Sequence, residues 1–423
     1  MEYKDLKMEG YDLHLLKTNK FKTVNFNVEI RFPLKREDRF FMSLLENVLP
    51  LSTGYKTLKM RNISCAEIYD PAWTIKSSVS GNQSMFSLRS SFLNEKYTEK
   101  GMTEKTVEYL LKIIFEPKTD GNQFIEDIFE KEKKNRLNYL RSLEDRPDAY
   151  SLVRLQGYMQ VYDFKPVTLE EMYYKTEKIS SKMLYEFYQK MIGSSKFDIF
   201  IAGDIDEDEI TRILNKNLKI SSTRKKSNFA YITQKTYNSP PHGYSEPVPN
   251  NQSKVLIGCK ALNLTDFEKK YVFTLYSWIL GGNNSLLFNT VREEHSLCYY
   301  IYSSRESLTG IMNIFAGIDA DKFDEVYDLI EENMEKMIKA DYPDEYLEGS
   351  RQVYYNSLNN IEDSLDSLTS NFESEKLTGS DSVDERRKNI SKVTKEDISA
   401  LAKKVHIDTI FLLKGEAHGE KNI

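Results

Sequence analysis

An order of predicted elements that occurs twice constrains the fold more than any other feature of this sequence. Before residue 220, a strand-like run at 22–33 precedes a helical stretch, two more strand-like runs, several helices and a strand at 197–203. After residue 252, the same order runs from a strand at 254–262 to a closing strand at 408–415. The two halves are not similar in letters, so the repeat lies in the pattern. It predicts an α+β fold of two similar halves, each an antiparallel or mixed β-sheet with helices packed on one face.

Residues 220–252 separate the two halves and differ from them in composition. This stretch contains four prolines and many Ser, Thr and Asn residues, and its apolar residues show weak periodicity. Such a composition is typical of a linker between domains. We therefore expect an N-terminal half at 1–219, a linker at 220–252 and a C-terminal half at 253–423.

Capping residues and glycines mark the ends of several predicted helices. Asp38 is placed to cap a helix, and Thr265 with Glu268 has the spacing of a capping box. The helix that follows this box is expected to end at Gly281–Gly282, because glycine readily adopts the conformation that closes a helix. Periodicity also predicts one helix over 344–375.

The composition argues against several classes of protein. Of the 423 residues, 40% are apolar, which is enough for a sizeable core, and the net charge of −6 argues against a nucleic-acid partner. The cysteines Cys65, Cys259 and Cys298 form no C-x-x-C pair, so we expect neither disulfides nor a cysteine zinc site. No secretory signal and no apolar run of about 18 residues occurs. We expect a cytoplasmic protein with no membrane partner.

The segment at 289–304, NTVREEHSLCYYIYSS, joins a charged helix end to a strand rich in aromatics. Arg292 lies seven residues before Tyr299 at this junction. In one interpretation, Arg292 stabilises the helix dipole and Tyr299 is an ordinary strand residue. In the other, both residues serve a binding site, because arginine presents several fixed hydrogen-bond donors and preorganised donors stabilise developing negative charge. His295, between them, is expected to be a surface residue.

The longer segment ILGGNNSLLFNTVREEHSLCYYIYSS, at 279–304, resembles the second half of the insulinase/pitrilysin metallopeptidases. This family includes mitochondrial processing peptidase and short bacterial heterodimeric forms. The shared features are a double glycine after a helix, a small–Leu–Phe helix, an Arg-Glu pair and a strand that starts near a tyrosine. The resemblance implies that Arg292 holds main-chain carbonyls of a substrate. It also implies that the Tyr299 hydroxyl approaches the scissile group.

Members of this family bind zinc through an inverted H-x-x-E-H motif on a helix of the first half. The matching helix here reads FMSLLENVL, and the resemblance aligns Ser43 and Asn47 with the two histidines and Glu46 with the catalytic base. Glu132 is the match for the third ligand. The histidines of this chain are too far apart in sequence to replace the motif: His14, His242, His295, His406 and His418. Because hydroxyl and amide groups are poor zinc ligands, we expect no catalytic zinc and no other cofactor in this chain.

Without a metal, Glu46 has no activated water to deprotonate, so we interpret it as an inherited or solvated helix carboxylate. Glu132 lies in the charged run EKEKK, which is typical of a solvated helix face. Cys259 and Cys298 fall on predicted strands and are expected to be core thiols.

The resemblance therefore implies a zinc-less, non-catalytic subunit of a heterodimeric insulinase-like metallopeptidase. Its implied partner is a zinc-bearing homologous subunit, and Arg292 and Tyr299 would bind a small unfolded peptide for maturation or turnover. A second hypothesis is a structural or peptide-binding dimerisation subunit of the same fold that takes no part in hydrolysis. A third, an independent hydrolase that uses Ser43 or a cysteine, is disfavoured because the chain has no G-x-S-x-G motif.

Overall fold

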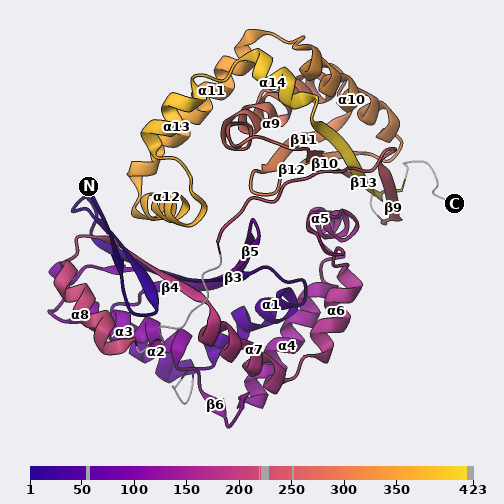
Figure 1. Cartoon of the computed structure of the whole chain (residues 1–423). Helices are drawn as coiled ribbons and strands as arrows, with labels where there is room; N and C mark the ends of the chain where they lie inside the picture. The colour runs from indigo at the N-terminus through magenta and orange to yellow at the C-terminus, as the bar shows by residue number, and fades with distance from the viewer. Residues whose placement is uncertain (54–57, 219, 221–227, 250–251, 417–423) are drawn as a thin grey trace. The chain divides into compact units, whose positions relative to one another are not determined.

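The computed structural model describes residues 1–53, 58–218, 220, 228–249 and 252–416, and the chain forms two compact units (Figure 1). Each unit contains a segment from the other side of the expected linker. The ranges are Met1–Tyr139, Met172–Ala230 and Asn359–Gly379 for unit 1, and Leu140–Glu171, Tyr231–Leu358 and Ser380–Ile423 for unit 2.

A six-stranded mixed sheet forms the centre of unit 1. Its strands in spatial order are β1 (Glu2–Lys7), β2 (Tyr11–Lys17), β8 (Lys196–Gly203), β3 (Thr23–Pro33), β5 (Gln83–Leu93) and β4 (Ala72–Ser80). β2 runs parallel to β8, and the other neighbours are antiparallel. In β3 the side chains of Phe26, Val28 and Ile30 are fully buried, and so are the alternate polar ones, such as Asn27 and Glu29. Because successive side chains point to opposite faces, this sheet has one apolar face and a second face, here called the polar face, on which polar and apolar residues are mixed.

Helices cover both faces of this sheet. Figure 1 shows α1, α3 and α7 on one face and α12 on the other. The helices wholly or mainly in unit 1 are α1 (Asp38–Val48), α2 (Leu58–Ala66), α3 (Met102–Phe115), α4 (Glu126–Arg141), α6 (Leu169–Lys178), α7 (Ser181–Ser194), α8 (Glu207–Asn217) and α12 (Leu365–Thr378). Short elements complete it: η1 (Leu49–Leu51), η2 (Glu95–Tyr97), β6 (Thr119–Asp120) and β7 (Gln123–Phe124).

Helix α12 lies late in the chain but packs on the polar face of the unit 1 sheet. Its apolar residues join a buried cluster that consists of Leu16, Met85, Phe200, Ala202, Leu365, Leu368, Phe372 and Leu377. Hydrogen bonds add to this contact: Asn25 Nδ2 donates to Asp366 Oδ1 at 2.7 Å, and Asn27 Nδ2 donates to Glu373 Oε1 at 2.6 Å. Two polar residues of β3 thus donate hydrogen bonds to a helix more than 300 residues away in sequence.

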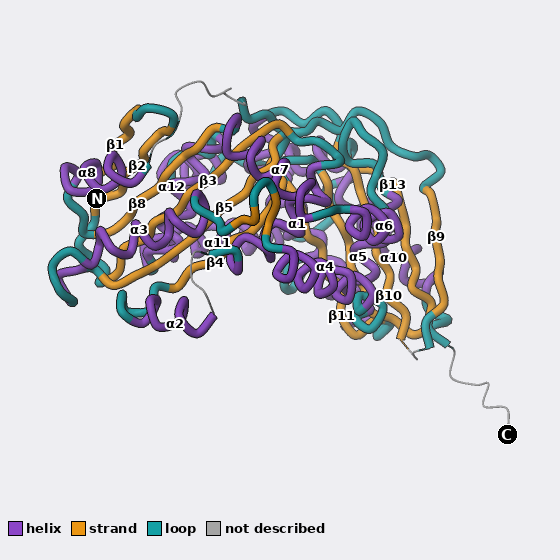
Figure 2. Tube along the Cα trace, turned by 90° about the horizontal axis from the view of Figure 1, so that it is seen from below, coloured by secondary structure: helices purple, strands orange, loops and turns teal. Residues whose placement is uncertain are grey.

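Unit 2 is built around a five-stranded mixed sheet. Its spatial order is β11 (Cys298–Glu306), β12 (Ile311–Asp319), β10 (Gln252–Ala261), β13 (Val405–Lys414) and β9 (His242–Pro247). β9 lies at one edge of the sheet beside β13 (Figure 2). These two strands are parallel, and the other neighbours are antiparallel. Apart from β1, unit 1 has the same order and directions, with β2 and β8 in the places of β9 and β13. The expectation of two similar α+β halves with mixed sheets is confirmed. The expected placement of the helices on one face is wrong for unit 1, because α12, from the other side of the linker, covers the second face of its sheet.

Helix α5 packs on the unit 2 sheet and lies opposite the other helices of this unit (Figure 1). Leu155 of α5 forms a buried cluster with Leu256, Phe411 and Leu413 of the sheet. Gly258 permits this contact, because a Cβ there would lie 2.6 Å from a neighbouring methionine sulfur. The helical elements wholly or mainly in unit 2 are α5 (Pro147–Tyr158), α9 (Phe273–Gly281), α10 (Phe323–Lys339), α11 (Asp344–Asn359), α13 (Val383–Ile390), α14 (Lys395–Ala402), and the π-helical η3 (Glu268–Val272) and η4 (Phe288–Glu294). The 3-10 turn η5 (Asn360–Asp363), which precedes α12, belongs to unit 1.

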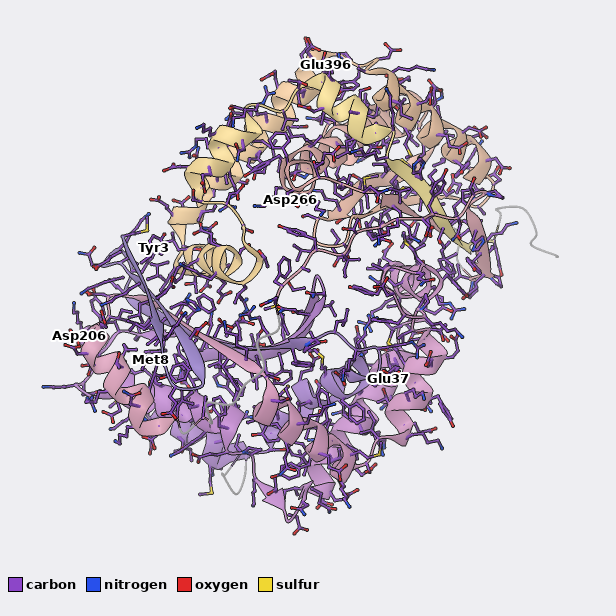
Figure 3. All side chains as sticks on the ribbon, viewed as in Figure 1. Tyr3, Met8, Glu37, Asp206, Asp266 and Glu396 are labelled. Carbon is purple, nitrogen blue, oxygen red and sulfur yellow. The ribbon has the colours of Figure 1, made fainter. Side chains whose placement is uncertain are left out.

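Of the three predicted helix ends, two are confirmed and one is wrong. The capping box is confirmed, because Thr265 N donates to Glu268 Oε2 at 2.7 Å and Glu268 N donates to Thr265 Oγ1 at 3.2 Å. The helix end at Gly281 is also confirmed. The capping role of Asp38 is wrong: Asp38 is the first helical residue, and Glu37, labelled in Figure 3, precedes it without a side-chain capping bond.

The single helix predicted over 344–375 is also wrong. The structure has two helices there, because Ser364 adopts an extended conformation and its Oγ accepts from Ser367 N at 3.1 Å to begin α12. A serine cap inside an apolar periodic stretch starts a new helix in a new direction.

Part of the expected linker is a strand, since β9 completes the unit 2 sheet. Residues 221–227 and 250–251 of that linker lie outside the described residues. β1, β2 and α2 were not anticipated by the sequence pattern. Across the part of the chain that the structure describes, none of the helices combines the length and apolarity that crossing a bilayer requires.

Candidate functional site

The residues aligned with the two missing histidines lie on one face of α1. Ser43 Oγ donates to Phe40 O at 3.1 Å, and Asn47 Nδ2 donates to Ser43 O at 2.8 Å. Both side chains thus direct a donor toward the backbone of their own helix, as serine and asparagine commonly do.

Glu46, which the resemblance aligns with a catalytic base, is bonded to a strand. Its Oε2 accepts from Ser77 N at 2.9 Å and from Ser77 Oγ at 2.8 Å. Ser77 belongs to β4, which is an edge strand of its sheet. The carboxylate therefore satisfies a backbone N–H that has no strand partner, which is one way in which proteins protect a sheet edge. A solvated Glu46 is therefore wrong, because the carboxylate is half-buried and joins α1 to β4. Its interpretation as an inherited carboxylate stays a prediction.

Glu132 on α4 is 9% exposed, so the solvated role expected for it is wrong too. Asn135 Nδ2 lies 3.2 Å from each of its carboxylate oxygens. One helical turn later, Arg136 approaches the same region: burial lowers the pKa of its guanidinium, and the charge of nearby Glu46 acts in the opposite direction. A guanidinium, which is always protonated in proteins, thus stands beside the position of the former base.

These residues do not fit zinc. The metal prefers Cys, His and carboxylate ligands, whereas Ser43 and Asn47 offer a hydroxyl and an amide that are already bonded to backbone carbonyls. A cation beside Glu46 adds electrostatic repulsion to a second one. No step that uses a metal-activated water follows from the residues of this chain.

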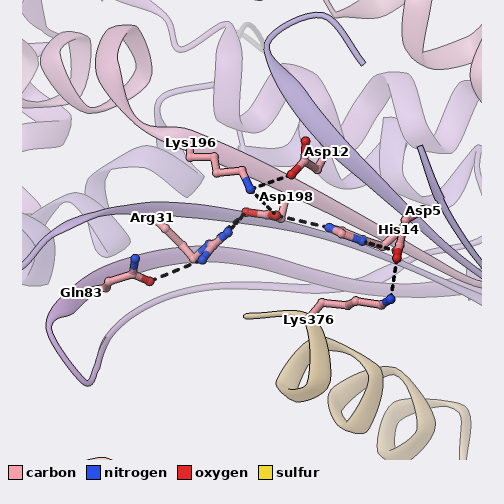
Figure 4. A network of polar contacts seen from close by, with 8 residues as sticks. All are labelled: Asp5, Asp12, His14, Arg31, Gln83, Lys196, Asp198 and Lys376. Carbon is pink, nitrogen blue, oxygen red and sulfur yellow. Dashed lines mark hydrogen bonds and ion pairs between the residues drawn. The ribbon is translucent and has the colours of Figure 1, made fainter. Parts of the chain in front are cut away.

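A second group of potential ligands lies on the polar face of the unit 1 sheet, where Figure 4 shows it. Ligand atoms of Asp12, His14 and Asp198 lie within 4.8 Å of one another. Cations of the protein already neutralise them: Lys196 Nζ lies 2.6 Å from Asp12 Oδ2, and Arg31 Nε donates to Asp198 Oδ2 at 2.9 Å. Burial acts to raise the pKa of Asp198, but the bond from His14 and the two cations hold it below its usual range. This cluster is a closed ion network.

Two more carboxylates are buried between the same sheet and α12. Glu29 and Glu373 both contact Arg89, whose Nη2 lies 3.1 Å from Glu29 Oε1 and 2.6 Å from Glu373 Oε2. Burial, followed by the charge of Glu373, raises the pKa of Glu29 to about 7, although Arg89 opposes this shift. Burial also raises the pKa of Glu373. One arginine therefore serves two acids, so the triad favours a proton on one of them.

Arg292 lies on the π-helical η4 in unit 2 and is exposed. Its side chain keeps 44% of its accessible surface, and its guanidinium lies 5.1 Å from the centre of the Phe288 ring. Its Nε lies 3.7 Å from Glu293 Oε1, which is a long ion pair on the surface. Such a pair contributes little to stability, so most of the donors of Arg292 remain available to a ligand.

Tyr299 is also exposed and lies at the start of β11, where a bulge interrupts the pairing with β12. It is 58% exposed, and its hydroxyl donates to Asp319 Oδ1 at 2.9 Å. This hydrogen bond to a carboxylate raises the pKa of the phenol, so Tyr299 stays protonated at neutral pH. β-Bulges often re-aim a side chain near a functional site.

Arg292 and Tyr299 thus belong to one helix–strand junction but have different partners. Arg292 contacts Glu293 and Phe288, whereas Tyr299 bonds to Asp319. His295 is exposed, as expected. Gly281 helps to form the junction, because a Cβ there would lie 2.5 Å from Ser303 N on β11.

A cleft of about 800 Å³ lies between α9, β11 and α11, and the sequence pattern did not predict it. Its lining residues do not include Arg292 or Tyr299. Trp278 at the end of α9, Tyr302 on β11 and Val353 on α11 line it. One of two tryptophans in the chain, close to a double glycine, is the signal that could have indicated it.

Residues 178–354 match a family model described as the peptidase M16 inactive domain. A Bacillus subtilis protein named "Probable inactive metalloprotease YmfF" is 26% identical over 414 residues, which cover 96% of each chain. A conserved protein from Enterococcus faecalis V583 has a similar structure, with a TM-score of 0.86 at 23% identity over 99% of this chain and 100% of that one. A peptidase M16 inactive domain from Pseudomonas fluorescens superimposes with a TM-score of 0.76 at 13% identity, over the full length of both. The two structures share the fold.

Proposed function

We propose that this chain belongs to the peptidase M16 family and is the zinc-less subunit of a two-chain peptidase, which binds the peptide that a zinc-bearing partner hydrolyses. The family model and the Bacillus relative both carry the word "inactive" in their descriptions. That agrees with a helix α1 whose residues do not suit a metal.

The observation that carries the proposal is the contrast between the two sets of polar residues. Ser43, Asn47 and Glu46, which the resemblance aligns with the metal motif, are engaged in bonds within the protein. In contrast, Arg292 and Tyr299 are exposed at a helix–strand junction. Buried, paired groups stabilise a fold, but an exposed arginine and tyrosine on ordered elements are typical of a binding surface.

The role of Arg292 is to bind main-chain carbonyl groups of an extended peptide, because its guanidinium has several donors in a fixed plane. The role of Tyr299 is to donate its hydroxyl proton toward the scissile carbonyl, since a protonated phenol stabilises developing negative charge. For this, the phenol must exchange its bond to Asp319 for one to the substrate. Small unfolded peptides are the proposed substrates.

Reconstitution tests the proposal. We would mix the purified chain with an M16 subunit from the same genome that has an intact H-x-x-E-H motif, and measure cleavage of a library of unfolded peptides. We expect zinc-dependent cleavage by the mixture and none by either chain alone. A stable complex that cleaves no faster than the zinc-bearing subunit alone would instead support a structural dimerisation subunit. A purified chain that itself holds one tightly bound zinc would refute the assignment.

A further inference from the structure

The segment that carries Arg292 has an unusual backbone. Residues Phe288–Glu294 form a π-helical turn, in which His295 N donates to Thr290 O at 3.1 Å, five residues earlier. π-Helical turns are rare and frequently occur at functional sites. A single extra residue in such a turn rotates the residues after it by roughly 100° about the helix axis. The direction of Arg292 therefore depends on whether this turn keeps its π-helical hydrogen bonds.

A buried asparagine contacts this turn from α10. The buried face of α10 is otherwise apolar and contains Val326, Ile330, Met334 and Met337, but Asn333, which has no exposed surface, lies among them. Its Nδ2 donates to Thr290 Oγ1 at 2.9 Å and to Leu329 O at 2.7 Å. A carbonyl oxygen can only accept, so the bond to Leu329 fixes the orientation of the amide.

The amide oxygen of Asn333 lowers the stability of the fold. Its Oδ1 is buried and has no hydrogen-bond partner within the described residues. An unsatisfied buried acceptor destabilises a protein, and a leucine would fit the apolar pattern of this helix face. A buried polar residue that lowers stability is best understood where it specifies one arrangement among several, as a buried asparagine does in coiled coils.

Thr290 accepts the hydrogen bond from Asn333. Its Oγ1 donates to Leu286 O at 2.9 Å, so the hydroxyl connects the amide of Asn333 with the preceding turn. The adjacent Asn289 donates from Nδ2 to the hydroxyl of Tyr346 on α11 at 2.8 Å. Two consecutive residues of η4 are thus held by two different helices.

We propose that Asn333 is a positioning residue, whose hydrogen bond to Thr290 selects the π-helical form of η4 and thereby directs Arg292 toward the bound peptide. The inference rests on the proposed function for the role of Arg292, but not for the conformation of η4. Without the bond, η4 relaxes toward α-helical hydrogen bonding, and Arg292 turns away from the direction it has in this structure.

The test compares Asn333→Leu with wild type in hydrogen exchange, thermal unfolding and peptide cleavage with the zinc-bearing partner. We expect faster exchange at the amides of residues 291–297, a Tm that is unchanged or higher, and cleavage that is slower by about tenfold to a hundredfold. In an Arg292→Ala background the same substitution should cause no further loss of cleavage, because both changes act through one guanidinium. Asn356→Leu, on the exposed side of α11, is the matched control and should change neither exchange nor cleavage.

Each outcome decides the proposal. Wild-type exchange at residues 291–297 in Asn333→Leu overturns it. If this variant unfolds at a much lower temperature, Thr290→Val removes the same bond from the other side, and unchanged exchange in that variant also overturns the proposal. Faster exchange in Asn333→Leu, combined with full cleavage by Arg292→Ala, supports the conformational role of Asn333 and refutes the proposed function of Arg292. The two failures can therefore be told apart.

Discussion

The two units share an order of strands, yet the candidate site residues of unit 1 and those of unit 2 differ in burial and in bonding. In unit 1, Glu46, Asp198 and Glu373 are partly or fully buried and bonded to groups of the protein. In unit 2, Arg292 has one long ion pair, and Tyr299 is more than half exposed. At these positions the carboxylates of unit 1 stabilise the fold through bonds within the protein, whereas Arg292 and Tyr299 of unit 2 are exposed to solvent.

Removal of the exposed arginine should have the largest effect on peptide cleavage. Arg292→Ala should lower peptide cleavage by the two-chain complex by about 10²- to 10³-fold, because a preorganised donor to the reacting peptide is lost. Steady-state cleavage, together with size-exclusion chromatography of the complex, measures this effect. The control is Arg387→Ala on α13, which should have wild-type activity. Full activity of Arg292→Ala would place the arginine among ordinary surface residues.

The second prediction concerns a metal site built into α1 of unit 1. Ser43→His with Asn47→His should bind zinc at least about a hundredfold more weakly than the same pair combined with Arg136→Ala, since the guanidinium competes for Glu46 and repels the metal. Zinc titration monitored by isothermal calorimetry compares the two variants. Equal affinity in both would show that Arg136 does not affect the site.

The buried acids of unit 1 predict a pH dependence that the surface of unit 2 should lack. The pKa of Glu29 is raised from its ordinary value of 4.5 to about 7, so the folded chain binds a proton more tightly than the unfolded chain. The free energy of unfolding should therefore fall as pH rises from about 4.5 to 7, by of order 1–3 kcal/mol, and then level off.

Urea unfolding at several pH values measures this dependence in wild type and in Glu29→Gln, where it should largely disappear. Tyr299→Phe is the control from unit 2 and should keep the wild-type profile of stability against pH. An unchanged profile in Glu29→Gln would mean that Glu29 does not carry the proton.

A smaller effect on activity is expected from the phenol. Tyr299→Phe should lower kcat of the complex by about tenfold and leave KM nearly unchanged, because the hydroxyl acts on charge that develops in the transition state. Single-turnover cleavage separates this effect from product release. A change confined to KM would indicate that Tyr299 binds the substrate and does not stabilise the transition state.

The smallest effect concerns the edge of the unit 1 sheet. Glu46→Ala should lower the free energy of unfolding by about 1–2 kcal/mol, because Ser77 N loses its acceptor, while peptide cleavage by the complex stays at the wild-type rate. Glu46→Gln keeps an acceptor oxygen and should cost less than Glu46→Ala. A large loss of cleavage in both variants would return Glu46 to the catalytic residues and end the contrast between the units.

Local patterns predicted most helices and strands, but they did not predict which unit each of them would join. The strands β3, β8 and β10 follow from alternating or continuous apolar runs, and the capping box at Thr265 follows from residue spacing. The chain contains no comparable signal that α12 would cover the unit 1 sheet or that β9 would complete the unit 2 sheet. Those placements depend on contacts between segments far apart in sequence, which periodicity does not record.

For the candidate site, the residue types alone indicate which side chains can bind a metal ion and which can donate hydrogen bonds to a ligand. Ser43 and Asn47 cannot replace two histidines as zinc ligands, and Arg292 and Tyr299 stand at a fixed spacing on one junction. Only the tertiary structure decided how each group is used. It buries Glu132, bonds Glu46 to Ser77 and places Asn333 against Thr290. The physical reason is that residue type sets what a side chain can donate, accept or ligate, whereas its burial and its partners are set by elements that meet only when the chain folds.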